Sequence, residues 1–358
     1  MFFFKRKCYP LLVFAAILLT ISSCITYEGP STTGFGPSEG WEKVNITFER
    51  AILNLRGNAF YLMAITDNQF FRIGSENEIL EKRILDVENG TYGRPEIADN
   101  VFSRITKNDD GQYQLEFHLT KNSAEIVKFI GIQLTEVPNE LVQIDYHGRN
   151  IGAFNGDGTR FILPTVTFPN FHYTFFVFDI RLDPSTFHFE KVELVQRIDV
   201  PELSSEFNNI GTIRNVSGNF YIAAKDGGFK IDKDGNYERV SAHWMKDYFS
   251  VGGNLFGTAF EDHYFETSLD GGNSWELYDK PSALKEVTVT GGKIFSQFLP
   301  GHQFGVSNDS LLVVTPIQLD DDFPDDNNSY QAIDYFSNNF YLSVGKDLYL
   351  SPEITEEK

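Results

Sequence analysis

One short element recurs along this chain and restricts its fold more than any other feature. In each copy, a turn rich in Gly or Asn is followed by an aromatic-rich run with the character of a strand. The copies are RGNAFYLMAI (56–65), DNVFSRI (99–105), HGRNIGAF (147–154), SGNFYIAA (217–224), GGNLFGTAF (252–260), GGKIFSQF (291–298) and SNNFYLSV (337–344). Successive copies are mostly about 35 to 47 residues apart, which is the length of a four-stranded propeller blade.

A second element, an acidic-glycine turn that leads to an aromatic residue, often follows the first. Its copies are DGQY (110–113), DGTRF (157–161), DGGF (226–229), DGNY (234–237) and DGGNSW (270–275). Short strands bounded by such turns, with no amphipathic helix of convincing length, indicate an all-β fold. The aromatic content of 15% fits a core in which aromatic side chains pair across strands.

We therefore predict an all-β protein that forms a β-propeller of seven blades, with six and eight blades as the neighbouring counts and two tandem β-sandwiches as the competing fold. One long gap, from near 148 to 219, predicts a hairpin insertion around 165–180 or a blade that the pattern does not delimit. Its aromatic side chains form either a binding platform or simply two buried strands, and the second interpretation is favoured. Ring closure predicts that Val44–Phe48 (VNITF) pairs with the final strands at 340–350.

The N-terminal residues have the features of a secretory signal. Lys5, Arg6 and Lys7 precede an apolar run that is too short to span a membrane, and Ser22 and Ser23 precede Cys24. Ile21 to Cys24 resembles the lipobox of bacterial lipoproteins, in which the cysteine is acylated and becomes the mature N-terminus. The resemblance implies a signal peptide at 1–23 and a lipid anchor at Cys24. The segment 25–40 is rich in Gly, Pro, Ser and Thr, so we predict a lipid-anchored flexible tether at 24–40, followed by the propeller domain at 41–358. Ile25 carries no acidic retention signal, so we expect the outer membrane, on its periplasmic or cell-surface side.

Cysteine usage and charge exclude several classes of function. Cys8 leaves with the signal and Cys24 would be acylated, so no thiol remains for catalysis, a disulfide or a zinc site. The chain carries a formal net charge of -20, and loss of the three basic signal residues makes the mature form about -23. Such a charge argues against nucleic acid as a partner.

The stretch SLDGGNSW resembles the Asp-box of bacterial neuraminidase (BNR) repeats over its whole length. The matching residues are Ser268, Asp270, Gly272, Ser274 and Trp275. Asp270 can accept hydrogen bonds inside its own turn, Gly272 can adopt a positive φ, and Trp275 can pack beneath the turn. In the resembled family these boxes are structural, so Asp270 is predicted to stabilise a blade hairpin; a catalytic or a calcium-binding Asp270 is the alternative.

The same resemblance raises a sialidase as a hypothesis. The nearest match to that family's arginine segment is Phe71-Arg72-Ile73-Gly74, which lacks the expected proline. No spacing singles out the Tyr–Glu pair that the chemistry needs, and only one complete Asp-box is present. A blade strand with one outward charge is therefore the favoured interpretation of Phe71 and Arg72.

Other candidate chemistry is weak. The acidic run at 320–326 could gather oxygen ligands for Ca²⁺ but lacks the spacing of a calcium loop, and the seven histidines show no paired metal motif. We therefore predict no metal and no cofactor. Asp309-Ser310-Leu311 resembles the short O-glycosylation motif of exported Bacteroidetes proteins, and a plain turn is the favoured interpretation.

These observations predict a lipid-anchored cell-envelope propeller that binds a glycan or a protein partner without catalysing a reaction. The alternative is a glycan-processing enzyme, a sialidase-like or other glycoside hydrolase or a lyase, whose residues are dispersed over several blades. Carboxylate pairs from distant blades leave no motif in a sequence, so the lack of a catalytic motif does not exclude this alternative.

Overall fold

The computed structural model describes residues 38–85, 91–121, 125–130, 141–144, 152–168, 172–204, 209–259, 264–281, 284–298, 303–307, 314–319 and 330–351. All regular elements in these ranges are β-strands. None of the described residues forms a helix long and apolar enough to cross a membrane. The predicted signal peptide with Cys24, the acidic run at 320–326 and Asp309 to Leu311 lie outside these ranges.

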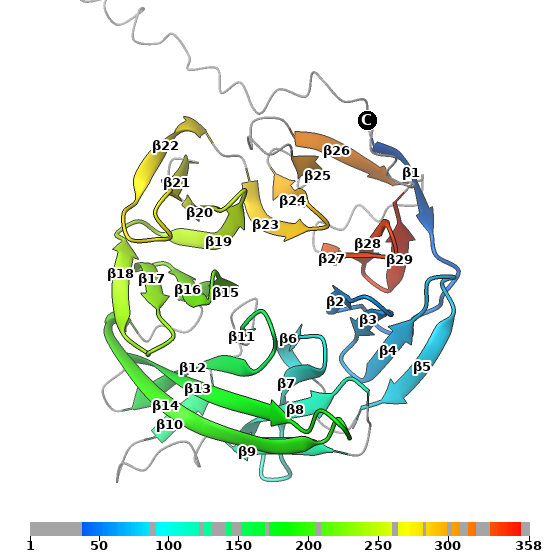
Figure 1. The fold of residues 1–358 in the computed structure, drawn as a ribbon, viewed down its shortest axis with the longest axis horizontal. Coiled ribbons are helices and arrows are strands. Elements are labelled where there is room, and N and C mark those ends of the chain that lie inside the picture. Colours follow the sequence, from blue (N-terminus) through cyan, green and yellow to red (C-terminus); the bar gives the residue numbers. More distant parts are fainter. Residues whose placement is uncertain are drawn as a thin grey trace, which may run out of the picture.

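The strands form seven small antiparallel sheets arranged in a ring (Figure 1). The innermost strands of neighbouring sheets contact one another around the whole ring, in the order β2, β6, β11, β15, β19, β23, β27 and back to β2. The all-β fold and the count of seven blades are therefore confirmed, and the tandem sandwiches are wrong.

The first three blades contain thirteen strands. Blade 1 consists of β2 (Asn54–Gly57), β3 (Leu62–Ile65), β4 (Gln69–Ile73) and β5 (Ile79–Ile84). Blade 2 consists of β6 (Tyr92–Ile97), β7 (Val101–Lys107), β8 (Tyr113–Leu119) and β9 (Ile126–Ile130). Blade 3 consists of β10 (Leu141–Ile144), β11 (Ala153–Phe154), β12 (Arg160–Phe168), β13 (His172–Leu182) and β14 (Phe189–Ser204). The strand β1 (Ser38–Lys43) precedes blade 1 in the chain and belongs to the closure of the ring.

The last four blades follow in chain order. Blade 4 consists of β15 (Ile210–Val216), β16 (Asn219–Ala224), β17 (Gly227–Ile231) and β18 (Tyr237–Ser241). Blade 5 consists of β19 (Met245–Val251), β20 (Asn254–Ala259), β21 (Tyr264–Ser268) and β22 (Glu276–Pro281). Blade 6 consists of β23 (Leu284–Thr290), β24 (Lys293–Phe298), β25 (Gln303–Ser307) and β26 (Val314–Leu319). Blade 7 consists of β27 (Tyr330–Phe336), β28 (Asn339–Val344) and β29 (Asp347–Leu350).

The recurring sequence element has one structural meaning in six blades. Its aromatic-rich run is the second strand of the blade, and its turn joins that strand to the innermost one. In four blades this is a two-residue turn with both central residues at positive φ, at Ser217-Gly218, Gly252-Gly253, Gly291-Gly292 and Ser337-Asn338. Such turns match the twist of the paired strands and favour Gly and Asn, which explains the repeat.

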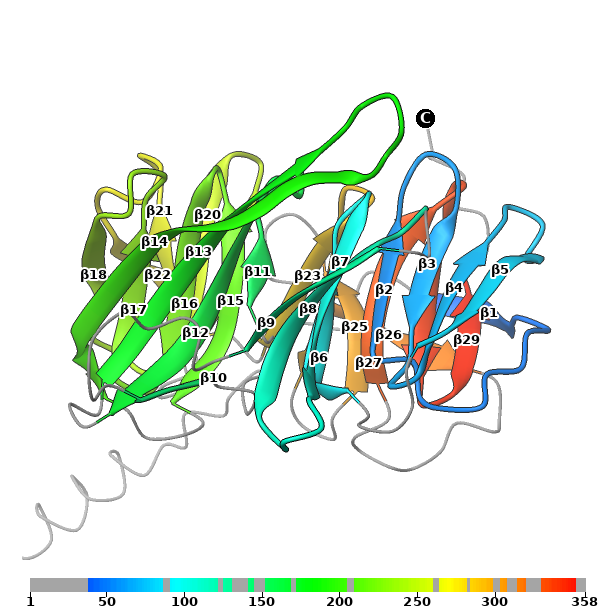
Figure 2. The same cartoon turned by 90° about the horizontal axis from the view of Figure 1, so that it is seen from below.

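Blade 3 departs from the pattern. Two short strands, β10 and β11, pair with opposite ends of the same edge of β12, and β13 and β14 form a long hairpin that projects beyond one face of the ring (Figure 2). Of the two interpretations of the long gap, the hairpin insertion at 165–180 is therefore wrong and the blade that the pattern does not delimit is confirmed, because β12 and β13 are central strands of blade 3. Tyr173, Phe175, Phe176 and Phe178 are fully buried, so the interpretation of two buried strands is confirmed over the described residues.

The ring is closed by β1, which lies between blades 6 and 7. It runs parallel to β26 and antiparallel to β29, where Glu42 faces Leu350 and Lys43 faces Tyr349. Closure of the ring by an N-terminal strand beside 340–350 is therefore confirmed, but the predicted bounds are wrong, because β1 forms the ladder. The segment Val44–Phe48 follows β1, and its Val44 N–H donates to the Leu348 carbonyl at 2.8 Å. Its alternating pattern arises because Val44, Ile46 and Phe48 are buried in the core beside β29.

Candidate functional site

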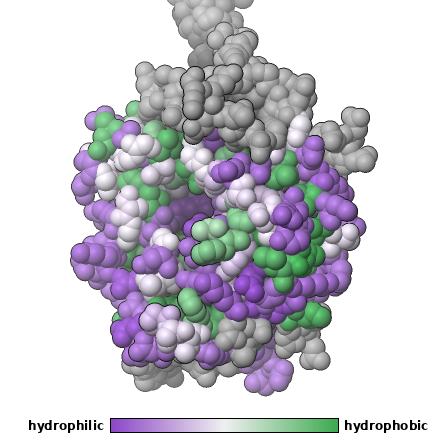
Figure 3. Space-filling view, turned by 45° about the vertical axis from the view of Figure 1, so that its right-hand side comes forward, coloured by the Kyte–Doolittle hydropathy of each residue, from purple (hydrophilic) through white to green (hydrophobic). Residues whose placement is uncertain are grey.

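The candidate site is a hollow at one mouth of the central channel, which we call the channel mouth. It is a cavity of about 460 Å³ formed by the innermost strands of six blades. Its lining includes six polar or charged side chains from four of these strands, which are Asn54, Arg56, Arg94, Glu96, Arg214 and Asp334. Figure 3 shows a hollow in this face of the ring with hydrophilic side chains around and inside it.

Asp247 on β19 holds three blades together beside the channel. Its side chain is fully buried and accepts two hydrogen bonds from Arg214, Nε to Oδ1 at 2.9 Å and Nη2 to Oδ2 at 3.0 Å. It also accepts bonds from the Thr212 hydroxyl and from the N–H groups of Tyr248 and Val287. A bidentate pair of this kind fixes both partners in position.

Asp334 on β27 plays the corresponding part at the junction of blades 6, 7 and 1. It accepts bonds from the Gly57 N–H at 3.0 Å, from its neighbour Tyr335 N–H at 2.8 Å and from the Thr290 hydroxyl. Burial raises the pKa of this carboxyl, and the charge of Arg56 and these hydrogen bonds only partly oppose it. Asp334 therefore joins neighbouring blades. It loses its proton less readily than a solvated aspartate does.

Two further arginines reach the same hollow from blades 1 and 2. Arg56 is 44% exposed, and its closest acidic partner is Asp99, with Nε to Oδ1 at 3.8 Å. Arg94 donates from Nη2 to Asn54 Oδ1 at 3.4 Å, while Asn54 donates to the Pro95 carbonyl at 2.7 Å. Arg56 thus contacts Asp99 through one nitrogen at 3.8 Å, whereas Arg214 donates two bonds to Asp247.

Glu96 on β6 lies among the three arginines and is partly buried. Burial raises its pKa to about 7, although the charges of Arg94, Arg214 and Arg56 all act to lower it. Glu96 and the three arginines line the same cavity. A carboxyl that changes its charge near neutral pH is characteristic of functional sites.

The channel mouth has no activated tyrosine. Tyr248 contributes to the lining, but its hydroxyl group packs against Gly228 on the third strand of blade 4, where a Cβ would collide with it. Burial raises the pKa of Tyr248 well above its ordinary range, and the charge of Glu266 raises it further. A buried phenol with a raised pKa is a poor candidate for the nucleophile of a sialidase.

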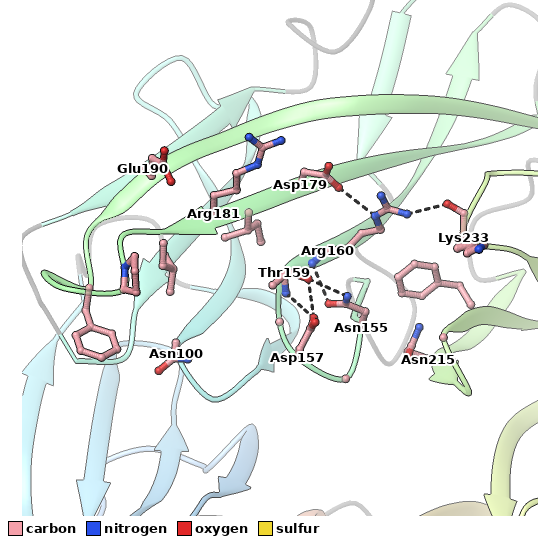
Figure 4. A pocket seen from close by; sticks show the side chains of 18 of the residues that line it. Asn100, Asn155, Asp157, Thr159, Arg160, Asp179, Arg181, Glu190, Asn215 and Lys233 are labelled. Carbon is pink, nitrogen blue, oxygen red and sulfur yellow. Dashed lines mark hydrogen bonds and ion pairs between the residues drawn. The ribbon is translucent and has the colours of Figure 1, made fainter.

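A larger groove adjoins the channel mouth on the same face. It has a volume of about 1240 Å³, lies beneath the β13–β14 hairpin and shares Asn215 and Ser217 with the channel mouth. Its central charge is already paired: Arg160 contacts Asp179 at 3.0 Å and donates to the Lys233 carbonyl at 2.8 Å (Figure 4). The groove therefore enlarges the hollowed surface beside the channel mouth, but Arg56, Arg94 and Arg214 lie in the channel mouth itself.

The turn that contains Asp270 joins β21 to β22 at the outer side of blade 5. Asp270 Oδ1 accepts the N–H groups of Asn273 and Ser274 at 3.0 and 2.9 Å, and the hydroxyls of Ser268 and Ser274 also donate to this carboxylate. Gly272 has a φ of 89°, and Trp275 packs edge-on against Tyr221 and Tyr248. The bonds from Ser274 and Ser268 lower the pKa of Asp270, so its charge is used within its own turn.

Arg72 lies on β4, the third strand of blade 1, away from the channel lining. It pairs with Glu81 on the adjacent strand and lies over the ring of Tyr61. The structure therefore does not bring Arg72 together with the arginines of the channel mouth. Within the described ranges, no cluster of three acidic, histidine or cysteine side chains is arranged to hold a metal ion.

Sequence reasoning missed the residues that form the channel mouth. Arg56, Arg94 and Arg214 lie on innermost strands whose sequences read NLRG, YGRPEI and GTIRNV. A signal was present, since each arginine precedes the turn that begins a copy of the recurring element. It could be interpreted only once the ring had placed the ends of these strands side by side.

No protein-family model matches this chain, and no curated protein matches it by sequence. Solved structures similar to it include YCF48 bound to D1 peptide, with a TM-score of 0.54 and 12% identity, covering 92% of this chain and 100% of that one. An oligogalacturonate lyase in complex with manganese has a TM-score of 0.53 and 11% identity, covering 90% and 97%.

PorZ, a surface component of the type-IX secretion system of Porphyromonas gingivalis, has a TM-score of 0.49 and 10% identity. The match covers 89% of this chain, which spans only 40% of that protein's length. At such identities the two structures with TM-scores above 0.5 support the fold alone.

Proposed function

We propose that this protein is a non-enzymatic binding scaffold whose channel mouth holds a carboxylate-bearing segment of a protein or glycan partner. One observation carries the proposal: three arginines from three blades converge on one hollow in a chain whose net charge is -20. An arginine fork matches the geometry of a carboxylate, so a local positive site in an acidic protein selects such groups.

The balance of charge in the hollow supports this ligand class. Asp247 offsets Arg214, and the two carboxyl groups that line the hollow, Glu96 and Asp334, both have pKa values that burial raises. The pKa of about 7 for Glu96 leaves that side chain partly protonated at neutral pH. The hollow therefore carries a positive excess that an incoming carboxylate would neutralise.

A glycan-processing enzyme is the second candidate, and Glu96 is the observation that favours it. A carboxyl with a pKa of about 7 is suited to act as a proton donor, and glycoside hydrolysis needs such a group opposite a second carboxylate. A screen of anionic and neutral glycosides tests this candidate. Turnover that is lost in Glu96→Gln would overturn the non-enzymatic proposal.

Binding is tested with labelled hexaglutamate, hexaglutamine and an oligogalacturonate in fluorescence polarisation at low salt. We expect binding of the two anionic probes, little binding of hexaglutamine, and affinity that falls as salt rises. Arg56→Gln should weaken binding, whereas Arg50→Gln is a matched control, since Arg50 is 58% exposed and pairs with Asp67 at 3.4 Å outside the hollow. Equal binding of hexaglutamine and hexaglutamate would contradict the proposal.

We further propose that this scaffold is a lipoprotein anchored through Cys24 at the outer membrane. The lipobox resemblance at 21–24 and the Gly/Ser/Thr-rich segment that follows it support the anchor. Cys24→Ala should move the protein from the membrane fraction to the soluble fraction. Unchanged fractionation would contradict the anchor and leave the binding proposal standing.

A further inference from the structure

A second polar pocket lies in blade 2, on the other side of the ring from the channel mouth. It is a cavity of about 140 Å³ at the end of β7 and β8 near their connecting turn. Asn100, in the turn between β6 and β7, lines the groove, so this turn lies on the groove side of the ring. Because β7 runs from that turn to the other end of the blade, the β7–β8 turn lies on the opposite side. This pocket is therefore independent of the channel mouth.

The strand register builds the pocket from one row of charged side chains. Arg104 on β7 faces Glu116 on β8, and Glu116 faces Lys128 on β9. Arg104 and Glu116 are both 1% exposed, which is rare for charged side chains and costly unless every polar group is paired.

Glu116 is saturated with hydrogen-bond donors. Oε2 accepts Arg104 Nε at 2.8 Å and His118 Nε2 at 2.9 Å, and Oε1 accepts bonds from Thr106, Gln114 and Lys128 at 3.1, 3.0 and 2.9 Å. Burial alone would raise the pKa of Glu116, but the bond from His118 and the charge of Arg104 hold it well below its usual range. No acceptor capacity of this carboxylate is left for a further donor.

Arg104 nevertheless retains an unused donor. Its Nη1 is buried and has no hydrogen-bond partner among the described residues, and the side chain lines the pocket. Lys107 and Lys128 line the same pocket, with Asp109 as the other acid besides Glu116. The lining thus has one more cation than anions and a buried donor that needs an acceptor.

We propose that this pocket binds a small oxyanion of the phosphate or sulfate class, with Arg104 Nη1 as the buried donor and Lys107 and Lys128 at the entrance. Such an ion offers several acceptor oxygens, and its charge offsets the excess cation. A water molecule occupies about 30 Å³ in the liquid, so the cavity has room for a tetrahedral ion with water beside it.

Calorimetric titration of the protein with inorganic phosphate, at constant ionic strength set with chloride and at pH 7, tests the site. We expect one phosphate per chain with a dissociation constant of order 1 mM or tighter, and sulfate in competition with it. Lys128→Met and Lys107→Met should each weaken binding by about tenfold through the loss of a charge-assisted bond. Two variants are used so that the test survives if one of them fails to fold.

Lys82→Met is the matched control. Lys82 is 41% exposed and pairs with Glu49 at 2.8 Å, whereas Lys128 is 44% exposed and pairs with Glu116 at 2.9 Å. Phosphate binding that persists in Lys82→Met but weakens in the two pocket variants supports the site. Absence of phosphate binding to the unaltered protein, or equal weakening in all three variants, would overturn it and leave water as the occupant. Unchanged phosphate binding in Arg56→Gln would show that this site and the channel mouth are separate.

Discussion

The Asp270 turn and the channel mouth use acidic side chains in opposite ways. Asp270 lies on the outside of blade 5, and local donors stabilise its charge and lower its pKa. Glu96 lies inside the ring, where burial raises its pKa to about 7 even beside three arginines. The most recognisable motif therefore uses its charge within its own turn, whereas the charges of the candidate site come from residues outside that motif.

Removal of the Asp247 carboxylate should have the largest effect on stability. Asp247→Ala leaves Arg214, Thr212 and two backbone N–H groups without their acceptor at a junction of three blades. We expect the free energy of unfolding to fall by about 2 to 4 kcal/mol, measured by urea denaturation. A loss below about 0.5 kcal/mol would contradict the part assigned to this residue.

Glu96→Gln should alter how stability depends on pH. The folded pKa of Glu96 is about 7, above the ordinary value of 4.5, so its stabilising contribution is complete below pH 4.5 and is lost as the pH rises through 7. A glutamine mimics the protonated form, so the variant should match the unaltered protein at pH 5 and exceed its stability by about 1 to 3 kcal/mol at pH 8.5. A difference that does not change between pH 5 and pH 8.5 would show that Glu96 ionises normally.

Asp270→Ala should have a smaller and purely structural effect. The turn loses the acceptor for Asn273, Ser274 and Ser268, so we expect the melting temperature to fall by a few degrees. Hexaglutamate binding should be unchanged in the same preparation, with Asp270→Asn as the conservative comparison. If Asp270→Ala lost hexaglutamate binding while its melting temperature stayed unchanged, the Asp270 turn would be part of the binding site.

Arg72→Gln should have the smallest effect. Arg72 pairs with Glu81 on the neighbouring strand, where both side chains retain about a quarter of their exposure, so its removal should cost about 0.2 to 1 kcal/mol. Binding of the anionic probes should not change, because Arg72 does not line the channel mouth. A large loss of binding would restore the sialidase-like interpretation of Phe71 to Gly74.

Most of the fold could be predicted from the sequence because its units are local. Two-residue turns with positive φ, such as Gly291-Gly292, place Gly and Asn at fixed points in each blade, so the repeat is visible in the letters. The closure strand was predicted at Val44–Phe48 because these residues alternate between apolar and polar. Such alternation indicates that one face is buried, but it does not show which strand edge the segment pairs with. Blade 3 was misjudged because its strands are longer and its inner edge is divided between β10 and β11.

The channel mouth could not be predicted in the same way. Its three arginines lie on blades 1, 2 and 4, at positions 56, 94 and 214. They come together only after the ring has closed. The raised pKa of Glu96 likewise depends on burial by neighbouring blades, which no local pattern records. An arginine before the repeat turn on several innermost strands is a signal that can be used in related propellers.

The most direct test of the proposed function is the affinity of the double variant Arg56→Gln/Arg94→Gln for hexaglutamate at pH 6 and low salt. The account predicts a loss of tenfold or more, about 1.4 kcal/mol or more, relative to both the unaltered protein and Arg50→Gln. Folding of the double variant is checked by its melting temperature. An affinity equal to that of Arg50→Gln, with the fold intact, would contradict the assignment of the channel mouth as the binding site.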